Sequence, residues 1–94
     1  MEEFLIVAYD GTDSEAMERR LRNRQAHLDG VKVLREKGNF INGGALLNDA
    51  GEMIGSSLFA KFSSRAELDE WLKTDPYVTG GVWQHIEVKR VRLV

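Results

Sequence analysis

The stretch NFINGGALLNDAGEMIGSSLFAKF, residues 39–62, decides the fold because it places two strand patterns between two helical segments. The patterns NFINGGALLN and EMIGSSLFAKF are joined by a short loop with Asp49 and Gly51, which is typical of a β-hairpin. Apolar residues alternate along the second strand, as expected when one face packs on a core. One face holds Ile54, Leu58, Ala60 and Phe62, and the other holds Met53 and Phe59.

A strand and a long helix precede the hairpin. Residues 4–9, FLIVAY, are apolar at both alternating sets of positions, as in a central strand covered on both faces. Residues 10–38 then change to a helical period, and Gly38 is the predicted stop. The predicted apolar stripe of this helix consists of Met17, Leu21, Leu28, Val31 and Leu34.

Two sequence features give different starts for the first helix. Thr12 and Glu15 have the spacing of a capping box. Gly30 and the polar residues around Asn23 instead predict a kink or a later start. Both alternatives stay open at this point.

A second helix and a last strand follow the hairpin. Ser64 and Glu67 form a capping box, and Pro76 ends the helix that they open. Leu68, Trp71 and Leu72 are its predicted buried residues. The segment GVWQHIEVKRVRLV, residues 81–94, reads as the closing strand.

The resulting order, β-α-β-β-α-β, predicts an α+β fold of the ferredoxin-like type, with residues 1–94 forming a single domain. Both helices cover one face of the sheet. The other face would expose apolar residues, and such patches usually mark an interface. We therefore expect a homodimer in which two open sheet faces pack together as a dimeric α/β barrel. The predicted open-face residues are Tyr9, Phe59, Trp83 and Leu93.

Composition narrows the functional classes. The chain has 94 residues, a formal net charge of −2 and no cysteine, which leaves no disulfide or thiolate metal site. Basic residues gather only in RRLRNR, so a nucleic-acid footprint is not expected. The N-terminal segment has neither signal-peptide nor membrane-span character, and a cytoplasmic location with no membrane partner is the default expectation.

Ionisable residues accompany the apolar stripe of the first helix. Steps of three and four residues place Arg20, Arg24 and His27 beside or within it. Buried charge is costly without a partner, so an acidic group from the chain or from a ligand should face them. The alternative is that Arg24 and His27 reach the helix edge and pair with groups at the end of the sheet.

Asp75 can serve two roles. Asp followed by Pro is a favoured N-cap for a short helical turn through Tyr77. Capping occupies one carboxylate oxygen, and the other can accept a hydrogen bond from a histidine ring. Both roles can hold together.

The other candidate residues give weaker signals. His85 is expected on the sheet face away from the helices, where it can equally be a partly covered interface histidine. Neither histidine has metal-ligand spacing, so no metal is expected. The glycines of NGGALLNDAG follow no phosphate-loop spacing, and Ser56, Ser57 and Ser63 have no nucleophile-elbow context.

Three segments together resemble the YciI-like family: RLRNRQAHL at 20–28, NGGAL at 42–46 and TDPYVTGGVWQHIEVK at 74–89. The resemblance covers nearly the whole chain. It implies a dimeric α+β barrel and a His–Asp active site carried by His27 and Asp75, with Arg24 and Tyr77 nearby. One type of family member is a dehydrochlorinase acting on a chlorinated hydroxyhydroquinone.

The sequence therefore predicts a small acid–base enzyme of the lyase, dehalogenase or isomerase type without a cofactor. His27 would move a proton, Asp75 would orient it, and Arg24 would hold an anionic or enolate-like oxygen of a small, anionic or ring-hydroxylated molecule. The alternative is a non-catalytic ligand-binding or accessory module with the same polar pocket. The expected substrate-binding residues are Arg24, Tyr77, Arg20, Gly44 and His85.

Overall fold

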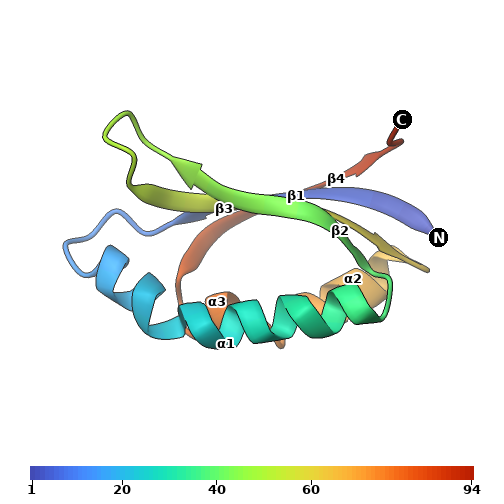
Figure 1. Cartoon of the computed structure of the whole chain (residues 1–94), viewed down its shortest axis with the longest axis horizontal. Helices are drawn as coiled ribbons and strands as arrows, with labels where there is room; N and C mark the ends of the chain where they lie inside the picture. Colours follow the sequence, from blue (N-terminus) through green and yellow to red (C-terminus); the bar gives the residue numbers. More distant parts are fainter.

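A computed structural model describes all residues, 1–94, as one four-stranded sheet with three helices against it (Figure 1). The elements are β1 (Glu2–Asp10), α1 (Ala16–Glu36), β2 (Phe40–Leu47), β3 (Met53–Phe62), α2 (Arg65–Leu72), α3 (Pro76–Thr79) and β4 (Trp83–Val91). The first helix runs along the sheet, and α2 and α3 lie beside it on the same face (Figure 1).

The sheet has the strand order β2-β3-β1-β4, and every neighbouring pair is antiparallel. The predicted hairpin joins β2 to β3, and β1 lies between β3 and β4. The α+β, ferredoxin-like fold predicted from the element order is confirmed. No helix of the chain is both long and apolar enough to cross a membrane.

The core lies between the sheet and the helices. Alternate residues of β1 and β3 point toward the helices, and Leu68 of α2 and Tyr77 of α3 pack onto them. Ser64 caps α2 as predicted, because its hydroxyl accepts a hydrogen bond from the backbone N–H of Glu67 at 3.2 Å. The strand residues of this core include Phe4, Ile6, Ala8, Leu58, Ala60 and Phe62.

The first helix differs from the prediction at its start. It is continuous from Ala16 to Glu36, so neither a kink at Gly30 nor a late start occurs. The Thr12–Glu15 capping box is also wrong, because Glu15 is the N-cap and its side chain makes no capping bond. Gly38 ends the helix as predicted, with a φ of 81° that favours glycine.

The buried stripe of α1 was predicted correctly at Leu34 and Val31, which pack in or against the core, but wrongly at Leu21 and Leu28. Arg20, His27 and Leu34 are its buried members, whereas Leu21 is 55% exposed and Leu28 is 40% exposed. The buried residues are seven apart, which is close to two helical turns, so they form one line along the helix. A polar line can face the core here because Arg20 and His27 both have acidic partners.

Trp83 lies on the helix-covered face of the sheet, not on the open face as predicted. The β1–β4 register shifts between Tyr9 and Asp10, which pair with His85 and Trp83. Gln84 is therefore an extra residue on β4, and such a bulge reverses the face of the residues beyond it. Trp83 is buried, whereas His85 stays on the open face beside Tyr9.

Candidate functional site

Two helices bring His27 and Asp75 together. His27 is on α1, and Asp75 precedes α3; the Nδ1 atom of His27 lies 2.9 Å from Oδ1 and 3.0 Å from Oδ2 of Asp75. Close packing of the helices permits this approach, because a Cβ atom at Gly80 would lie 2.6 Å from the side-chain amide of Asn23. The predicted proximity of the two residues is thus found in the structure.

Asp75 also caps α3, as its Asp-Pro sequence predicted. Its Oδ1 accepts a hydrogen bond from the backbone N–H of Tyr77 at 2.8 Å, and Pro76 occupies the first helical turn. The side chain of Asp75 is 1% exposed. The capping bond therefore holds the carboxylate in the position from which it contacts His27.

Aromatic rings fix the orientation of His27. The Tyr77 ring stacks on the imidazole with centroids 3.9 Å apart and an interplanar angle of 9°, and Trp83 meets it edge-on at 5.5 Å. A carboxylate can only accept hydrogen bonds, so the Nδ1 atom facing Asp75 carries the hydrogen. In the neutral imidazole the Nε2 atom then carries the lone pair, and it has no partner within the chain, which is the arrangement of a general base.

A second buried ion pair lies beside this one. Arg20 Nη1 donates to both carboxylate oxygens of Asp10, at 2.9 and 3.0 Å, and each side chain is 4% exposed. Arg20 Nη2 donates to Ser56 Oγ at 3.1 Å, and the guanidinium lies 4.8 Å from the centre of the Tyr77 ring. Asp10 is thus the acidic partner that the buried arginine requires.

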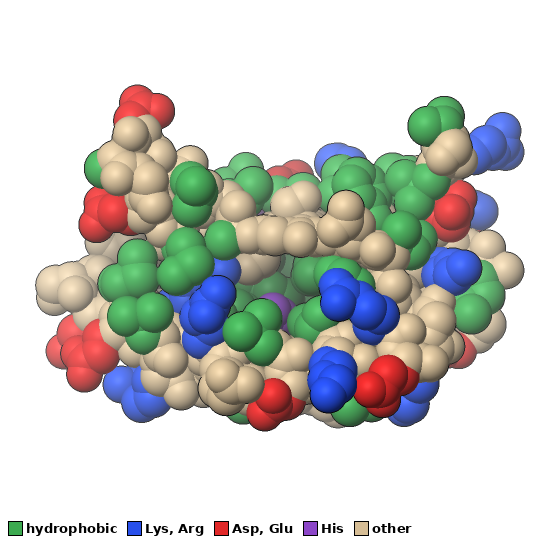
Figure 2. Space-filling view, viewed as in Figure 1, with side chains coloured by type: hydrophobic (Ala, Val, Ile, Leu, Met, Phe, Trp, Pro, Cys, Tyr) green, Lys and Arg blue, Asp and Glu red, His purple; other side chains and the backbone are tan.

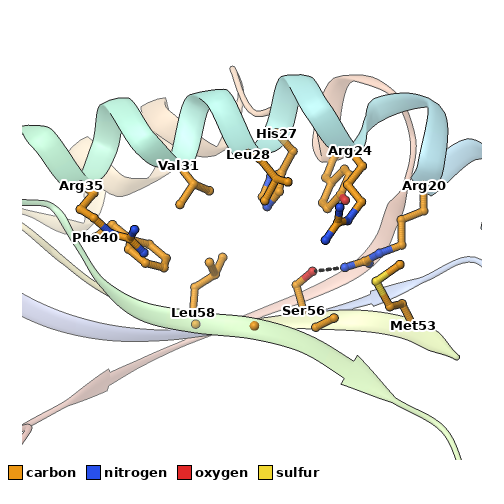
Figure 3. A pocket seen from close by; sticks show the side chains of 14 residues that line it. Arg20, Arg24, His27, Leu28, Val31, Arg35, Phe40, Met53, Ser56 and Leu58 are labelled. Carbon is orange, nitrogen blue, oxygen red and sulfur yellow. Dashed lines mark hydrogen bonds between the residues drawn. The ribbon is translucent and has the colours of Figure 1, made fainter. Parts of the chain in front are cut away.

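A cavity of about 200 Å³ opens between α1 and strands β2 and β3. Figure 2 shows this hollow, with histidine visible at its bottom and Lys or Arg side chains on both sides. None of its 14 lining residues is acidic, and the arginines Arg24 and Arg35 pair with no carboxylate of the chain. In Figure 3, Arg24 extends from α1 toward the sheet. The remaining lining residues include Leu28, Val31, Phe40, Gly43, Ala45, Met53 and Leu58.

This charge arrangement favours an anionic or oxygen-rich ligand. Arg20 is neutralised by Asp10, so Arg24 and Arg35 supply positive charge that no side chain of the cavity balances. Arg35 lies over the Phe40 ring at 4.8 Å, at the opposite end of the drawn site from Arg24 (Figure 3). Apolar Val31 and Leu58 lie between these ends (Figure 3).

Tyr77 enters the cavity as a neutral phenol at ordinary pH. Burial raises the pKa of its hydroxyl above the usual value of 10.0, and the positive charges of Arg20 and Arg24 oppose that shift. The phenol can therefore donate or accept a hydrogen bond without carrying charge. No group of three or more His, Cys, Asp or Glu side chains is arranged to hold a metal ion.

Of the residues predicted from the sequence, Arg20, Arg24, His27, Gly44 and Tyr77 all line this cavity. Gly44 contributes only backbone, because glycine has no side chain. Its register with Ser57 would in any case direct a side chain to the open face. The structure does not bring His85 to the cavity. His85 lies on the opposite face of the sheet, with its Nε2 atom 3.8 Å from Glu87.

Sequence reasoning missed Asp10, Ser56 and Trp83 as parts of the site. Asp10 ends the central strand, and the unpaired charge expected on α1 was a signal for an acid near that end. Ser56 is the polar position on the otherwise apolar inner face of β3, which was also a usable signal. Trp83 had none, because a bulge decides which face it occupies.

The fold and this cavity define a class: a ferredoxin-like α+β domain with a buried His–Asp pair at the wall of a cavity that is lined by arginines without carboxylate partners. A family model for the YCII-related domain matches residues 2–92, so the chain belongs to the YCII-related family. Protein YciI of Escherichia coli O6:H1 is 35% identical to it, with 97% of each chain covered.

Solved structures share the fold of this chain. The 5-chloro-2-hydroxyhydroquinone dehydrochlorinase TftG of Burkholderia phenoliruptrix AC1100, in complex with 2,5-dihydroxybenzoquinone, has a TM-score of 0.83 and 28% identity, covering 96% of this chain and 93% of that chain. An antibiotic biosynthesis monooxygenase has a TM-score of 0.55 and 14% identity, covering 100% of this chain and 99% of that chain. The second similarity shows the fold alone.

Proposed function

We propose that this protein is a cofactor-independent acid–base enzyme that moves a proton on a small, ring-hydroxylated or anionic molecule. The observation that carries the proposal is the hydrogen bond between His27 Nδ1 and Asp75 Oδ1, buried at the wall of a cavity without an acidic side chain. Asp75 leaves Nε2 of His27 as the proton acceptor and stabilises the imidazolium that forms.

Arg24 supplies the second part of the proposed chemistry. Taking a proton from a hydroxylated ring builds negative charge on a ring oxygen, and a neighbouring cation stabilises that charge. Arg24 extends into the cavity and has no carboxylate partner to neutralise it. It is the residue to which we assign this oxygen.

The dehydrochlorinase TftG supports a hydroxylated ring as the substrate class, because it is 28% identical over 96% of this chain. Elimination of HCl from its substrate removes one proton and one chloride ion. In the proposed reaction the ring first shifts to its keto form, in which a hydroxyl proton has moved to the chlorinated carbon. His27 then takes the proton of a remaining hydroxyl, whose electron pair forms the second C=O bond of the quinone, and chloride leaves with the electron pair of the C–Cl bond. The cavity of about 200 Å³ can hold a single substituted ring.

Chloride release from 5-chloro-2-hydroxyhydroquinone tests this proposal. His27→Asn retains an N–H that can face Asp75 but lacks the basic nitrogen, so turnover should fall about a hundredfold or more. His85→Asn is the matched control, since His85 is the other histidine and lies on the opposite sheet face. Equal loss in both variants, or full turnover in His27→Asn, would contradict the proposed role. Binding without any turnover would favour a ligand-binding module.

A further inference from the structure

The hydrogen bonds around Ser56 determine which role its hydroxyl is free to play. Ser56 Oγ accepts a hydrogen bond from Arg20 Nη2 at 3.1 Å and another from Trp83 Nε1 at 3.1 Å. A hydroxyl oxygen has two acceptor positions and one hydrogen to donate. Both acceptor positions are therefore used, and the hydrogen is donated to no group of the chain.

Neither partner of Ser56 can accept a hydrogen bond in place of donating one. The guanidinium of Arg20 and the indole N–H of Trp83 only donate hydrogen bonds, so neither can accept the hydrogen of Ser56. Asp10 holds Arg20 through both carboxylate oxygens, which prevents the guanidinium from turning away. The direction of both bonds at Ser56 is thus fixed by the chemistry of its partners.

Ser56 lies where an occupant of the cavity can reach it. The residue is 4% exposed and lines the cavity, rising from the sheet on the side opposite Arg24 (Figure 3). No acidic side chain lines this space. No other lining residue accepts a hydrogen bond from Ser56, so its hydrogen is available to an acceptor on a molecule that enters.

Protein stability alone does not account for this arrangement. Arg20 Nε is buried without any hydrogen-bond partner, and it is the chain's sole side-chain nitrogen or oxygen in that state. A buried charge with an unfilled donor costs free energy of folding. The same guanidinium, however, fills one acceptor position of the Ser56 hydroxyl and leaves its hydrogen free.

We propose that Ser56 is a specificity-determining residue whose hydroxyl donates a hydrogen bond to an oxygen of the bound molecule. The site then selects molecules that present a carbonyl, enolate or phenolate oxygen to the sheet side of the cavity, and it rejects those that present an N–H there. This assignment takes its ligand class from the proposed function and adds the group that recognises one of the ligand's oxygens. A site built around a hydrogen bond discriminates strongly, since a wrong ligand leaves a buried group unpaired.

Titration with 2,5-dihydroxybenzoquinone tests the assignment. Ser56→Ala removes the donor and should weaken binding about tenfold or more, whereas Ser56→Thr keeps a hydroxyl and should stay within about threefold of the parent chain. Ser57→Ala is the matched control, because Ser57 is the next residue and its side chain lies on the open face. It should bind like the parent.

Ser56→Asp separates recognition from a merely structural role. An ionised carboxylate can accept from both Arg20 and Trp83 but has no hydrogen to donate. Because an added carboxylate also repels anions, this variant is titrated with the neutral 1,4-benzoquinone as well. If Ser56 only holds these two side chains, Ser56→Asp should bind the neutral quinone like the parent; the assignment predicts loss of that binding in a folded protein. Urea unfolding of each variant verifies that it is folded.

The binding and turnover experiments test the two proposals separately, so either proposal can be overturned without the other. Binding that depends on Ser56 without chloride release would overturn the acid–base reaction and support the assignment of Ser56. Unchanged binding in Ser56→Ala would overturn the assignment, whatever His27 does. A parent chain that does not bind 2,5-dihydroxybenzoquinone would overturn it as well.

Discussion

Asp75 holds His27 and the first turn of α3 with the same carboxylate oxygen. Its Oδ1 atom lies 2.9 Å from His27 Nδ1 and 2.8 Å from the backbone nitrogen of Tyr77. Helix α3 therefore positions the Asp75 carboxylate, and the same carboxylate stabilises α3. Substitutions that keep one of these bonds and lose the other can separate the two roles.

Asp75→Asn should separate catalysis from capping. Its amide oxygen can still cap α3, so the free energy of unfolding should fall by at most about 1 kcal/mol. Asparagine carries no negative charge to stabilise an imidazolium, and activity that depends on His27 should fall strongly. Urea unfolding and chloride release measure the two effects.

Asp75→Ala is the comparison for this prediction. It removes the cap and leaves the buried Nδ1 of His27 without a partner, so it should cost about 2 kcal/mol or more. Equal losses of stability in the Asn and Ala variants would show that the cap contributes little.

The proximity of His27 and Asp75 could be predicted because it follows from topology and local signals. Each residue belongs to a helical segment on the same sheet face, and the Asp-Pro pair fixes the start of α3. The order of strands and helices was likewise readable from periodicity and capping patterns. These signals are local, so they survive without knowledge of tertiary contacts.

The errors arose where tertiary contacts decide. The rotation of α1 depends on Asp10, which makes burial of Arg20 more favourable than burial of the exposed Leu21. The face of Trp83 depends on a one-residue bulge at Gln84, which no pattern of alternation reveals. Neither the partner of an arginine nor a shifted register is encoded in the spacing of apolar residues.

Gly55→Ala should destabilise the chain severely. Gly55 lies in β3 opposite Tyr9, and a Cβ atom there would overlap the backbone carbonyl oxygen of Ala8. Backbone cannot move aside as a flexible side chain can, so the strands would have to separate; overpacking of this kind costs about 1–3 kcal/mol or more. Thermal or urea unfolding measures the loss.

Gly30→Ala is the matched control for that substitution. Gly30 lies within α1, and a Cβ atom there would meet nothing within 4 Å. Alanine favours the helix over glycine, so this variant should gain about 0.5–1 kcal/mol of stability. Similar effects at both positions would contradict the role assigned to the close strand approach at Gly55.

The buried phenol of Tyr77 should make the protein less stable at high pH. Its pKa is raised in the folded chain above the usual value of 10.0, chiefly by burial, so the folded state favours the protonated form. This contribution is fully present below pH 10.0 and is lost as pH rises through the higher folded pKa. The free energy of unfolding, measured below pH 10.0 and at higher pH, should show the decline.

Tyr77→Phe should flatten that decline, because phenylalanine has no proton to lose. Tyr9→Phe is the control, since Tyr9 is the other tyrosine and lies on the opposite face of the sheet from Tyr77. Absorbance titration of each variant assigns the later-ionising phenol. If Tyr77, the tyrosine that remains in Tyr9→Phe, has a pKa at or below the usual value of 10.0, the effect of burial on Tyr77 is refuted.

The open sheet face leads us to propose a homodimer in which two copies cover it. Leu5, Val7, Tyr9 and Phe59 lie on this face, away from the helices, and no other part of the chain packs over them. Light scattering should therefore give twice the chain mass of 10.7 kDa, and the unfolding temperature should rise with protein concentration.

Val7→Lys would place charge at the centre of the contact and should both dissociate and destabilise the protein. Ala26→Lys, on the exposed side of α1, adds the same charge away from the contact and should do neither. A stable monomer at micromolar concentration would refute the dimer, and equal behaviour of the two lysine variants would show that this sheet face is not its interface.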